Sequence, residues 1–155
     1  MPVQRLKDFL DEHQVKYVVI SHSRAFTTQE IAAATHIPGK ELAKTVIVDI
    51  DGETAMAVLP GSQKVELALL RDALGSKQVT LAKESAFRDR FPECELGAMP
   101  PFGNLYGMPV YVADSLTEDE EIAFNAGSHT QLVKMAYRDF ERLVQPEVMR
   151  FTVNA

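Results

Sequence analysis

The chain has 155 residues, of which 46% are hydrophobic and 25% are charged, and its formal net charge is −6. This length and composition suit one globular domain that needs no disulfide or structural metal. The negative charge argues against a broad nucleic-acid-binding face, because such faces concentrate lysine and arginine, so any nucleic-acid contact is expected to be local. The single cysteine, Cys94, and the scattered histidines offer no ligand spacing for zinc. We therefore expect no metal and no cofactor.

The N-terminal stretch MPVQRLKDFLDEH interrupts its apolar residues with charged ones and does not resemble a secretory signal. No apolar run approaches the ~18 residues that would span a bilayer. We therefore expect a cytoplasmic protein that makes no membrane contact.

The first third of the chain alternates helical and extended patterns. Apolar residues at helical spacing predict an amphipathic helix over residues 3–13, and the β-branched stretch that follows predicts a strand over residues 16–20. Thr27 and Glu30 stand at the spacing of a capping box, which satisfies free backbone amides at the start of a helix. A second helix is therefore expected to begin just after Thr27.

The middle of the chain contains the clearest turn. Asp51-Gly52 supplies the positive φ angles of a tight hairpin between apolar runs at residues 45–50 and 54–59. Beyond this hairpin the patterns predict, in chain order, a helix over 66–74 ending at Gly75, a strand over 77–82, a short helix over 84–91, strands over 110–114, 121–127 and 131–136, a helix over 137–144 and an extended segment over 149–153.

Residues 97–109, GAMPPFGNLYGMP, contain three prolines and three glycines, which is too many for a helix or a central strand and predicts a shaped loop. Because the strands include both a hairpin and longer crossovers, the sheet should be mixed rather than purely parallel. We expect an α/β (mixed α+β) fold in one domain over residues 1–155, with a curled, barrel-like mixed sheet surrounded by helices. The loop 97–109 and the turn around His129 are expected to line the concave mouth of this sheet.

Gly127-Ser128-His129 stands between two apolar runs and allows two interpretations. As a turn, the glycine permits the reversal, the serine is solvated and the histidine caps a strand. As a catalytic feature, Gly127 would let backbone N–H groups approach a substrate oxygen, and His129 would donate a hydrogen bond or carry a proton near neutral pH.

Lys44 stands directly before the apolar run 45–50, where a strand entering a core normally carries a small or apolar residue. Its ammonium is therefore expected at the end of the sheet or in a cavity, where it could meet a phosphate or carbonyl oxygen. The alternative is an edge lysine in water. Other basic residues in the middle of the chain form either a solvated mixed surface or a small rim around one site: Lys40, Lys64, Arg71, Lys77 and Lys83.

Familiar catalytic patterns are absent, including the glycine-rich phosphate loop, the G-x-S-x-G elbow and H-E-x-x-H. Cys94 has no histidine nearby in the sequence and no helix start to lower its pKa, which argues against a thiolate nucleophile. The acidic residues at the hairpin tip, Asp49, Asp51 and Glu53, are interpreted as solvated turn residues.

Four segments in order resemble the YbaK/ProX family, whose members are similar to the editing domain inserted in bacterial prolyl-tRNA synthetases: ELAKTVIVD (41–49), VLPGSQKVELALLRDALG (58–75), GAMPPFGNLYGMPVYVADSL (97–116) and AFNAGSHTQLVKMAYRDFERL (123–143). The resemblance extends from His22 to Leu143. It implies a free-standing aminoacyl-tRNA deacylase that removes a wrongly attached amino acid from tRNA in trans, without a metal or a protein nucleophile. Water would attack the ester, backbone amides would hold the oxyanion, and the neighbouring ribose hydroxyl would assist.

The resemblance also assigns roles to residues. Lys44 would anchor a phosphate or oxygen of the terminal adenosine of the tRNA, and the turn ending at His129 would shape the amino-acid pocket. The residues expected to be catalytic are Lys44, Gly127 and His129, and those expected to contact the substrate are Thr45, Pro101, Phe102, Gly103 and Ser128. We also predict that Lys44, the loop 101–103 and His129 line one cleft, because the chemistry needs them around a single ester.

The sequence departs from two groups within the family. Thr45 stands where alanine-specific relatives are expected to have asparagine, and GAMPPFG replaces the Gly-Gly-Cys-Ser-Pro type of loop in cysteine-specific relatives. The loop suggests a small pocket, so alanine, serine or threonine is favoured, and more than one of them is expected to be accepted. The alternative function is a non-catalytic module that binds aminoacylated tRNA ends or an aminoacyl-tRNA synthetase. A synthetase is also a candidate partner if the protein is a deacylase.

Overall fold

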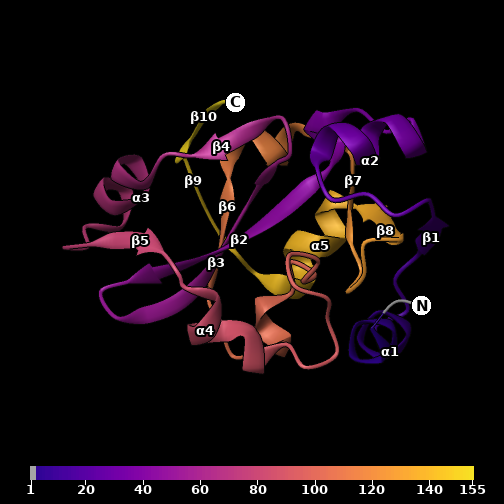
Figure 1. Cartoon of the computed structure of the whole chain (residues 1–155), viewed down its shortest axis with the longest axis horizontal. Coiled ribbons are helices and arrows are strands. Elements are labelled where there is room, and N and C mark those ends of the chain that lie inside the picture. The colour runs from indigo at the N-terminus through magenta and orange to yellow at the C-terminus, as the bar shows by residue number, and fades with distance from the viewer. Residues whose placement is uncertain (1–2) are drawn as a thin grey trace.

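The computed structural model describes residues 3–155, and its strands fall into groups with helices around them (Figure 1). The predicted domain range 1–155 also contains Met1 and Pro2, which lie outside the described residues. Within residues 3–155 the strands form sheets of three, two and five strands, with both antiparallel and parallel pairs. The predicted mixed α/β class is confirmed. The single barrel-like sheet that we expected is replaced by separate sheets, none of which closes into a barrel.

The first elements follow the sequence pattern closely. α1 spans Gln4–Glu12 and β1 spans Tyr17–Ser21. α2 spans Thr28–Thr35 and begins with the predicted capping box: the hydroxyl of Thr27 accepts from the backbone N–H of Glu30 at 3.1 Å, and the carboxylate of Glu30 accepts from the N–H of Thr27 at 3.1 Å. This helix therefore starts where its cap residue dictates.

The central hairpin is formed by β2, Ala43–Ile50, and β3, Glu53–Pro60, paired antiparallel along their whole length. Asp51 and Gly52 take φ angles of +50° and +93° in the turn. Asp51 is more than a solvated turn residue, because its carboxylate accepts from the backbone N–H of Lys77 and Gln78, just before the strand that begins at Val79.

The five-stranded sheet has the order β5-β2-β3-β6-β9, with β3–β6 and β6–β9 parallel. Besides β2 and β3, it contains β6 (Val110–Ala113) and the two edge strands β5 (Val79–Leu81) and β9 (Glu147–Met149). The three-stranded sheet has the order β1-β8-β7, with β7 at Glu121–Asn125 and β8 at Gln131–Ala136. The two sheets meet at an isolated parallel bridge between Leu42 and Ala123.

A small sheet pairs β4, Gln63–Val65, with β10, Thr152–Asn154. β4 was not predicted, and the extended segment expected over 149–153 is divided between β9 and β10. The remaining helices are α3 (Leu67–Leu74), α4 (Glu84–Phe87) and α5 (Tyr137–Val144). Short 3₁₀ turns occupy Gly39–Glu41, Arg88–Arg90, Gly103–Leu105 and Asp114–Glu118.

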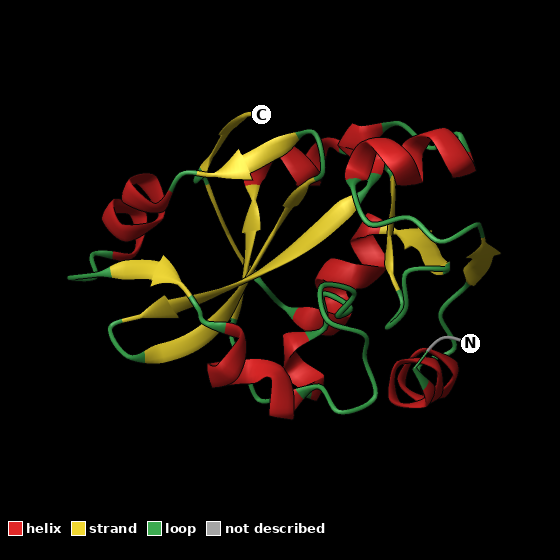
Figure 2. Ribbon diagram, viewed as in Figure 1, coloured by secondary structure: helices red, strands yellow, loops and turns green. Residues whose placement is uncertain are grey.

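Helices cover the two sheets at opposite ends of the molecule: α3 lies beside β5, while α1 and α2 lie on the side of the three-stranded sheet (Figure 2). The main core joins side chains from both sheets, with Ile47 and Met56 from one and Ile122 and Phe124 from the other. This shared core fixes how β2 sits relative to the β7–β8 turn. Residues far apart in the sequence can therefore form one site between them.

Candidate functional site

The candidate site begins at an unpaired stretch of β2. One edge of β2 pairs fully with β3, but the other edge pairs with β5 only from Val48 onward and meets β7 only at Leu42. Ile47 directs its carbonyl to this second edge, where it accepts from Ala82 N–H at 3.0 Å. Because backbone groups alternate along a strand, Thr45 directs its N–H and C=O to the same edge, in a gap that no strand of residues 3–155 fills.

A pocket of about 370 Å³ opens on this gap, and we call it the β2-edge pocket. Thr45, which was predicted to contact the substrate, lies in its wall. None of the other basic residues considered as a rim lines it. The lining residues come from β2, β5, α4 and the loop after α4: Thr45, Val46, Ile47, Leu81, Ala82, Glu84, Phe87, Leu96, Gly97 and Met99.

Lys44 precedes Thr45 and is half-buried, so its side chain is partly removed from water. Burial lowers the pKa of Lys44, and no carboxylate of residues 3–155 forms an ion pair with its ammonium. Alternation along β2 directs its side chain to the opposite face from Thr45. A desolvated cation without a partner weakens the fold, and such groups are concentrated at binding sites.

Through Gly127, the turn after β7 contacts two distant segments, the loop after α4 and the N-terminal segment. The N–H of Gly127 donates to the carbonyl of Ala98 at 2.9 Å, and its carbonyl accepts from Glu95 N–H at 2.8 Å. Gly127 has a φ of +101°, and a Cβ there would lie 2.1 Å from a methyl carbon of Val3. The N–H of Gly127 is therefore already used inside the protein, and the amide expected there for a substrate oxyanion is not free.

His129 is buried, with 6% of its surface exposed. Its Nε2 lies 2.8 Å from the carbonyl oxygen of Leu96, which requires the proton on Nε2, and 3.9 Å from a carboxylate oxygen of Glu95. The backbone carbonyl of His129 accepts from Ala25 N–H at 3.1 Å. Through the hydrogen bond to Leu96, His129 holds the Leu96–Gly97 segment of the pocket wall in place.

Ser128 closes the turn locally. It is half-buried, and its hydroxyl lies 3.2 Å from that of Thr130 and accepts from Thr130 N–H at 3.4 Å. The Gly-Ser-His turn therefore makes its hydrogen bonds to other groups of the protein.

Two side chains beside His129 were not singled out in the sequence. Phe26 stacks at a tilt on the His129 ring, with 4.6 Å between ring centroids, yet 61% of its surface is exposed. Arg24 lies over the Phe26 ring at 5.5 Å and forms an ion pair with Glu95 at 2.7 Å. In the sequence, the signal was a phenylalanine directly before the helix-capping residue Thr27. An apolar residue in this position usually packs against the helix, so the sequence alone did not indicate that Phe26 is exposed.

The loop 97–109 divides into an exposed part and a buried part. Gly97 is exposed in the pocket wall, whereas Pro101, Phe102 and Gly103 are all buried. Phe102 is fully buried among aromatic rings, 5.5 Å from Phe124 between centroids. A Cβ on Gly103 would lie 2.6 Å from the Met108 carbonyl oxygen. Residues 101–103 thus pack the loop against the core, and their contact with the substrate stays a prediction.

A second pocket of about 270 Å³ adjoins the first and shares Phe87, Leu96 and Met99 with it. Cys94 lines this second pocket, and its sulfur lies 3.8 Å from the hydroxyl oxygen of Tyr106. Burial raises the pKa of the Cys94 thiol. The thiolate is therefore disfavoured, in agreement with the sequence argument against a cysteine nucleophile.

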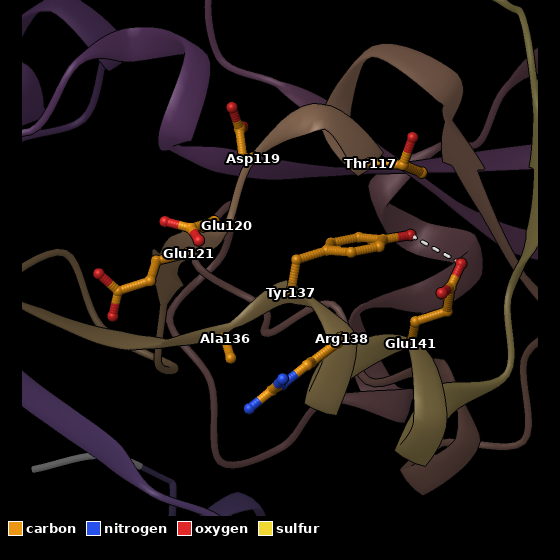
Figure 3. A pocket seen from close by; sticks show the side chains of 8 residues that line it. All are labelled: Thr117, Asp119, Glu120, Glu121, Ala136, Tyr137, Arg138 and Glu141. Atoms are coloured by element: carbon orange, nitrogen blue, oxygen red, sulfur yellow. Dashed lines mark hydrogen bonds between the residues drawn. The ribbon is translucent and has the colours of Figure 1, made fainter.

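A larger cavity, of about 590 Å³, lies elsewhere, between the open end of the β7–β8 hairpin and α5 (Figure 3). We call it the β7–α5 pocket. Tyr137 lies across it with its hydroxyl directed at Glu141, 3.4 Å away. The pocket is lined by Thr117, Asp119, Glu120, Glu121, Ala136, Tyr137, Arg138 and Glu141. Because four carboxylates and one arginine line the pocket, its electrostatic potential is negative and disfavours phosphate.

Burial raises the pKa of Asp119 to about 6, and the neighbouring Glu41 carboxylate adds to this effect. Over residues 3–155, histidine, cysteine and acidic side chains nowhere gather in threes in an arrangement suited to a metal ion. No helix in the same range combines the length and apolar character needed to cross a membrane.

The structure thus brings Thr45, Gly97 and the supporting turn at 127–129 close together. Gly97 connects the pocket to the turn, since a Cβ on it would lie 3.6 Å from a ring carbon of His129. Lys44 does not line the pocket itself but directly precedes Thr45, which does. That Lys44 and His129 line one cleft around a substrate stays a prediction.

Comparison with known families supports the resemblance drawn from the sequence. Residues 22–143 match the family described as "Aminoacyl-tRNA editing domain". The match covers most of the chain, and the chain belongs to this family.

Named relatives are similar over most of their length. The chain is 29% identical over 157 residues to the multifunctional Ser/Thr-tRNA deacylase ProXp-y of Escherichia coli K12, covering 96% of this chain and 91% of the relative. It is 25% identical over 142 residues to the prolyl-tRNA editing protein ProX of Acetoanaerobium sticklandii, covering 88% and 86%.

Solved structures share the fold. The hypothetical protein APE2540 superimposes with a TM-score of 0.86 at 18% identity, covering 97% of this chain and all of that one. A protein provisionally described as a trans-editing enzyme for prolyl-tRNA synthetase superimposes with a TM-score of 0.83 at 17% identity, covering 97% and 96%.

Proposed function

We propose that this protein is an aminoacyl-tRNA deacylase that acts in trans and hydrolyses the ester joining a wrongly attached amino acid to tRNA. The observation that carries the proposal is the half-buried, unpaired ammonium of Lys44 beside the open edge of β2, in a chain of the editing family. An anion would stabilise this cation, and the phosphates at the end of a tRNA supply one.

In the proposed reaction, water adds to the ester carbonyl carbon, and the carbonyl oxygen takes up negative charge. Backbone N–H donors stabilise this oxyanion, as in other acyl transfers. The candidate oxyanion donors at the β2-edge pocket are the N–H groups of Thr45, on the open edge of β2, and of Gly97, in the pocket wall. The bond from carbonyl carbon to ribose oxygen then breaks, the ribose oxygen receives the proton released by water, and free amino acid and tRNA are formed.

The proposed amino acid is serine, threonine or alanine. The β2-edge pocket is mostly apolar but carries the hydroxyl of Thr45, which can hydrogen-bond a hydroxylated side chain. The Escherichia coli relative is named a Ser/Thr-tRNA deacylase. A methylene group is worth only ~1–3 kcal/mol in a hydrophobic pocket, so more than one of these amino acids is expected to be hydrolysed.

The tRNA partner is proposed to be contacted locally, at its acceptor end, because the net charge of −6 disfavours a wide phosphate-binding face. An aminoacyl-tRNA synthetase remains a candidate second partner. Adding the purified synthetase to the deacylation assay and measuring the change in KM tests this.

The alternative is a module that binds aminoacylated tRNA ends without hydrolysis. It is favoured by one observation: the N–H of Gly127 and Nε2 of His129 are both directed at carbonyl oxygens of the protein itself. Under this alternative the chain would bind mischarged tRNA and leave the ester intact.

The test is deacylation of tRNAs carrying alanine, serine, threonine or cysteine by the wild type, Lys44→Ala and the control Lys16→Ala, which removes an exposed lysine before β1. Losing a charge-assisted contact of roughly 1.5–3 kcal/mol should slow Lys44→Ala about ten- to hundredfold, while Lys16→Ala stays near wild type. Chelator is expected to have no effect.

Lys44→Ala should melt at or slightly above the wild-type temperature. The folded-state pKa of Lys44 is lowered, so its charge weakens the fold below that pKa, and this cost is relieved as pH rises through it. Binding without hydrolysis by the wild type would favour the alternative. Full activity of Lys44→Ala would reject the assigned role of this lysine, and loss of activity on chelation, restored by zinc, would reject the metal-independent mechanism.

A further inference from the structure

Phe26 is exposed where local packing rules would bury it. It directly precedes Thr27, the N-cap of α2, and an apolar residue at that position usually packs on the fourth residue of the helix, here Ile31. Ile31 is instead buried in a cluster with Ala25 and Leu42 that does not include Phe26. The ring of Phe26 is therefore not needed to fix the start of the helix.

The exposed ring is nevertheless held in place. His129 supports it at 4.6 Å and is itself fixed by the Leu96 carbonyl. Arg24 lies over the ring at 5.5 Å and is held by Glu95. With 61% of its surface in water, Phe26 is thus a supported aromatic surface rather than a loose side chain.

This surface adjoins the proposed reaction site. The His129 ring that supports Phe26 also lies against Gly97, in the wall of the β2-edge pocket. Phe26 and the pocket wall therefore both border one buried ring. A substrate whose ester enters the pocket would place its adjoining nucleoside toward Phe26.

We propose that Phe26 is a stacking surface for the 3′-terminal base of the tRNA, with Arg24 beside it. This inference rests on the proposed function and names a group of the substrate that the chain recognises. Aromatic side chains bind nucleic-acid bases through stacking, and an adjacent arginine adds cation–π attraction. In an acidic protein, stacking supplies affinity that does not require a broad basic face.

The experiment measures binding of uncharged tRNA, so that it does not depend on hydrolysis. Wild type and Phe26→Ala are each titrated with intact tRNA and with the same tRNA lacking its terminal adenosine. Base stacking on an aromatic side chain corresponds to roughly a 5- to 150-fold difference in affinity. Removing the adenosine should weaken binding by the wild type more than binding by Phe26→Ala, and the difference between the two should fall within this range, because any contact of Lys44 with the terminal adenosine is lost from both.

Phe26→Tyr should retain the preference for the intact end, and Phe26→Leu, apolar but not aromatic, should reduce it as Phe26→Ala does. Val148→Ala, which truncates an exposed apolar residue on the distant strand β9, is the control and should behave as wild type. Equal sensitivity of wild type and Phe26→Ala to the adenosine would overturn the proposal. So would a change in oligomeric state in Phe26→Ala without that coupling, which would identify the ring as a contact between copies of the chain. Absence of hydrolysis with the coupling intact would reject only the proposed function.

Discussion

The β7–β8 hairpin has a cavity at each end, and the two ends differ in kind. At its turn, the backbone of residues 126–130 holds the N-terminal segment, the residues before α2 and the loop after α4. At its open end lies the larger β7–α5 pocket, lined by carboxylates. The smaller cavity has backbone donors and a neighbouring unpaired lysine, whereas the larger one repels the phosphates that a tRNA carries. For the proposed function, charge and free hydrogen-bonding groups therefore favour the smaller cavity over the larger one.

At the turn of the β7–β8 hairpin, the substitution with the largest expected effect is Gly127→Ala. The positive φ and the close approach to Val3 should together destabilise the protein by about 2–5 kcal/mol in urea unfolding. Gly52→Ala is a matched control, because Gly52 also has a positive φ, +93°, but nothing within 4 Å of the new Cβ. A cost for Gly127→Ala no larger than for Gly52→Ala would show that the packing against Val3 is unimportant.

His129 distinguishes positioning from proton transfer at the same turn. His129→Ala removes the hydrogen bond to Leu96 and should cost about 1–3 kcal/mol in stability, with roughly a tenfold or larger loss of deacylation. His129→Gln can still donate to that carbonyl and should recover most of the activity. A general acid or base contributes roughly a hundredfold or more, so a comparably large loss in a well-folded His129→Gln would assign His129 a proton-transfer role instead.

Asp119 tests the opposite end of the hairpin. Its folded-state pKa, raised to about 6, exceeds the unfolded value of 3.8, so its ionised form weakens the fold above about pH 6. This cost is relieved as pH falls from 6 to 4. Asp119→Asn should therefore melt higher than wild type at pH 8, with the difference disappearing near pH 4, while deacylation is unchanged. A large loss of activity would move the site to the β7–α5 pocket.

The smallest effect is expected for Cys94→Ser. Water is the proposed nucleophile, and burial keeps the thiol protonated, so the deacylation rate should stay within about twofold of wild type. An inactive Cys94→Ser with a native thermal melt would overturn the mechanism.

Local signals in the sequence predicted most elements of the fold. The capping box at Thr27 and the Asp51-Gly52 turn act within a few residues, and both appear where expected. β4 was missed because it is only three residues long and is stabilised by pairing with β10, almost ninety residues away. The separation into sheets depends on such distant pairings, which no local pattern encodes.

The site was predicted less completely. Thr45 lies in the pocket wall, but Phe102 is buried, because a sequence motif does not tell which part of a loop faces the core. Phe26 and Leu96 were missed, since their importance comes from contact with His129, about a hundred and about thirty residues further along the chain. Such residues are found only when the distant segments are placed together.

The hydrogen bonds made by the turn at Gly127 also affect the order in which the chain folds. They join the turn to Ala98 and Glu95, about thirty residues earlier, and Ala126 accepts from the N–H of Val3, more than a hundred residues away. Closing such long loops is entropically slow, whereas the β2–β3 hairpin closes over two residues. In pulsed hydrogen exchange during refolding, amides of the hairpin should gain protection before the N–H of Gly127. On a ribosome, the region around Gly127 would then mature only after the chain has been synthesised past β8.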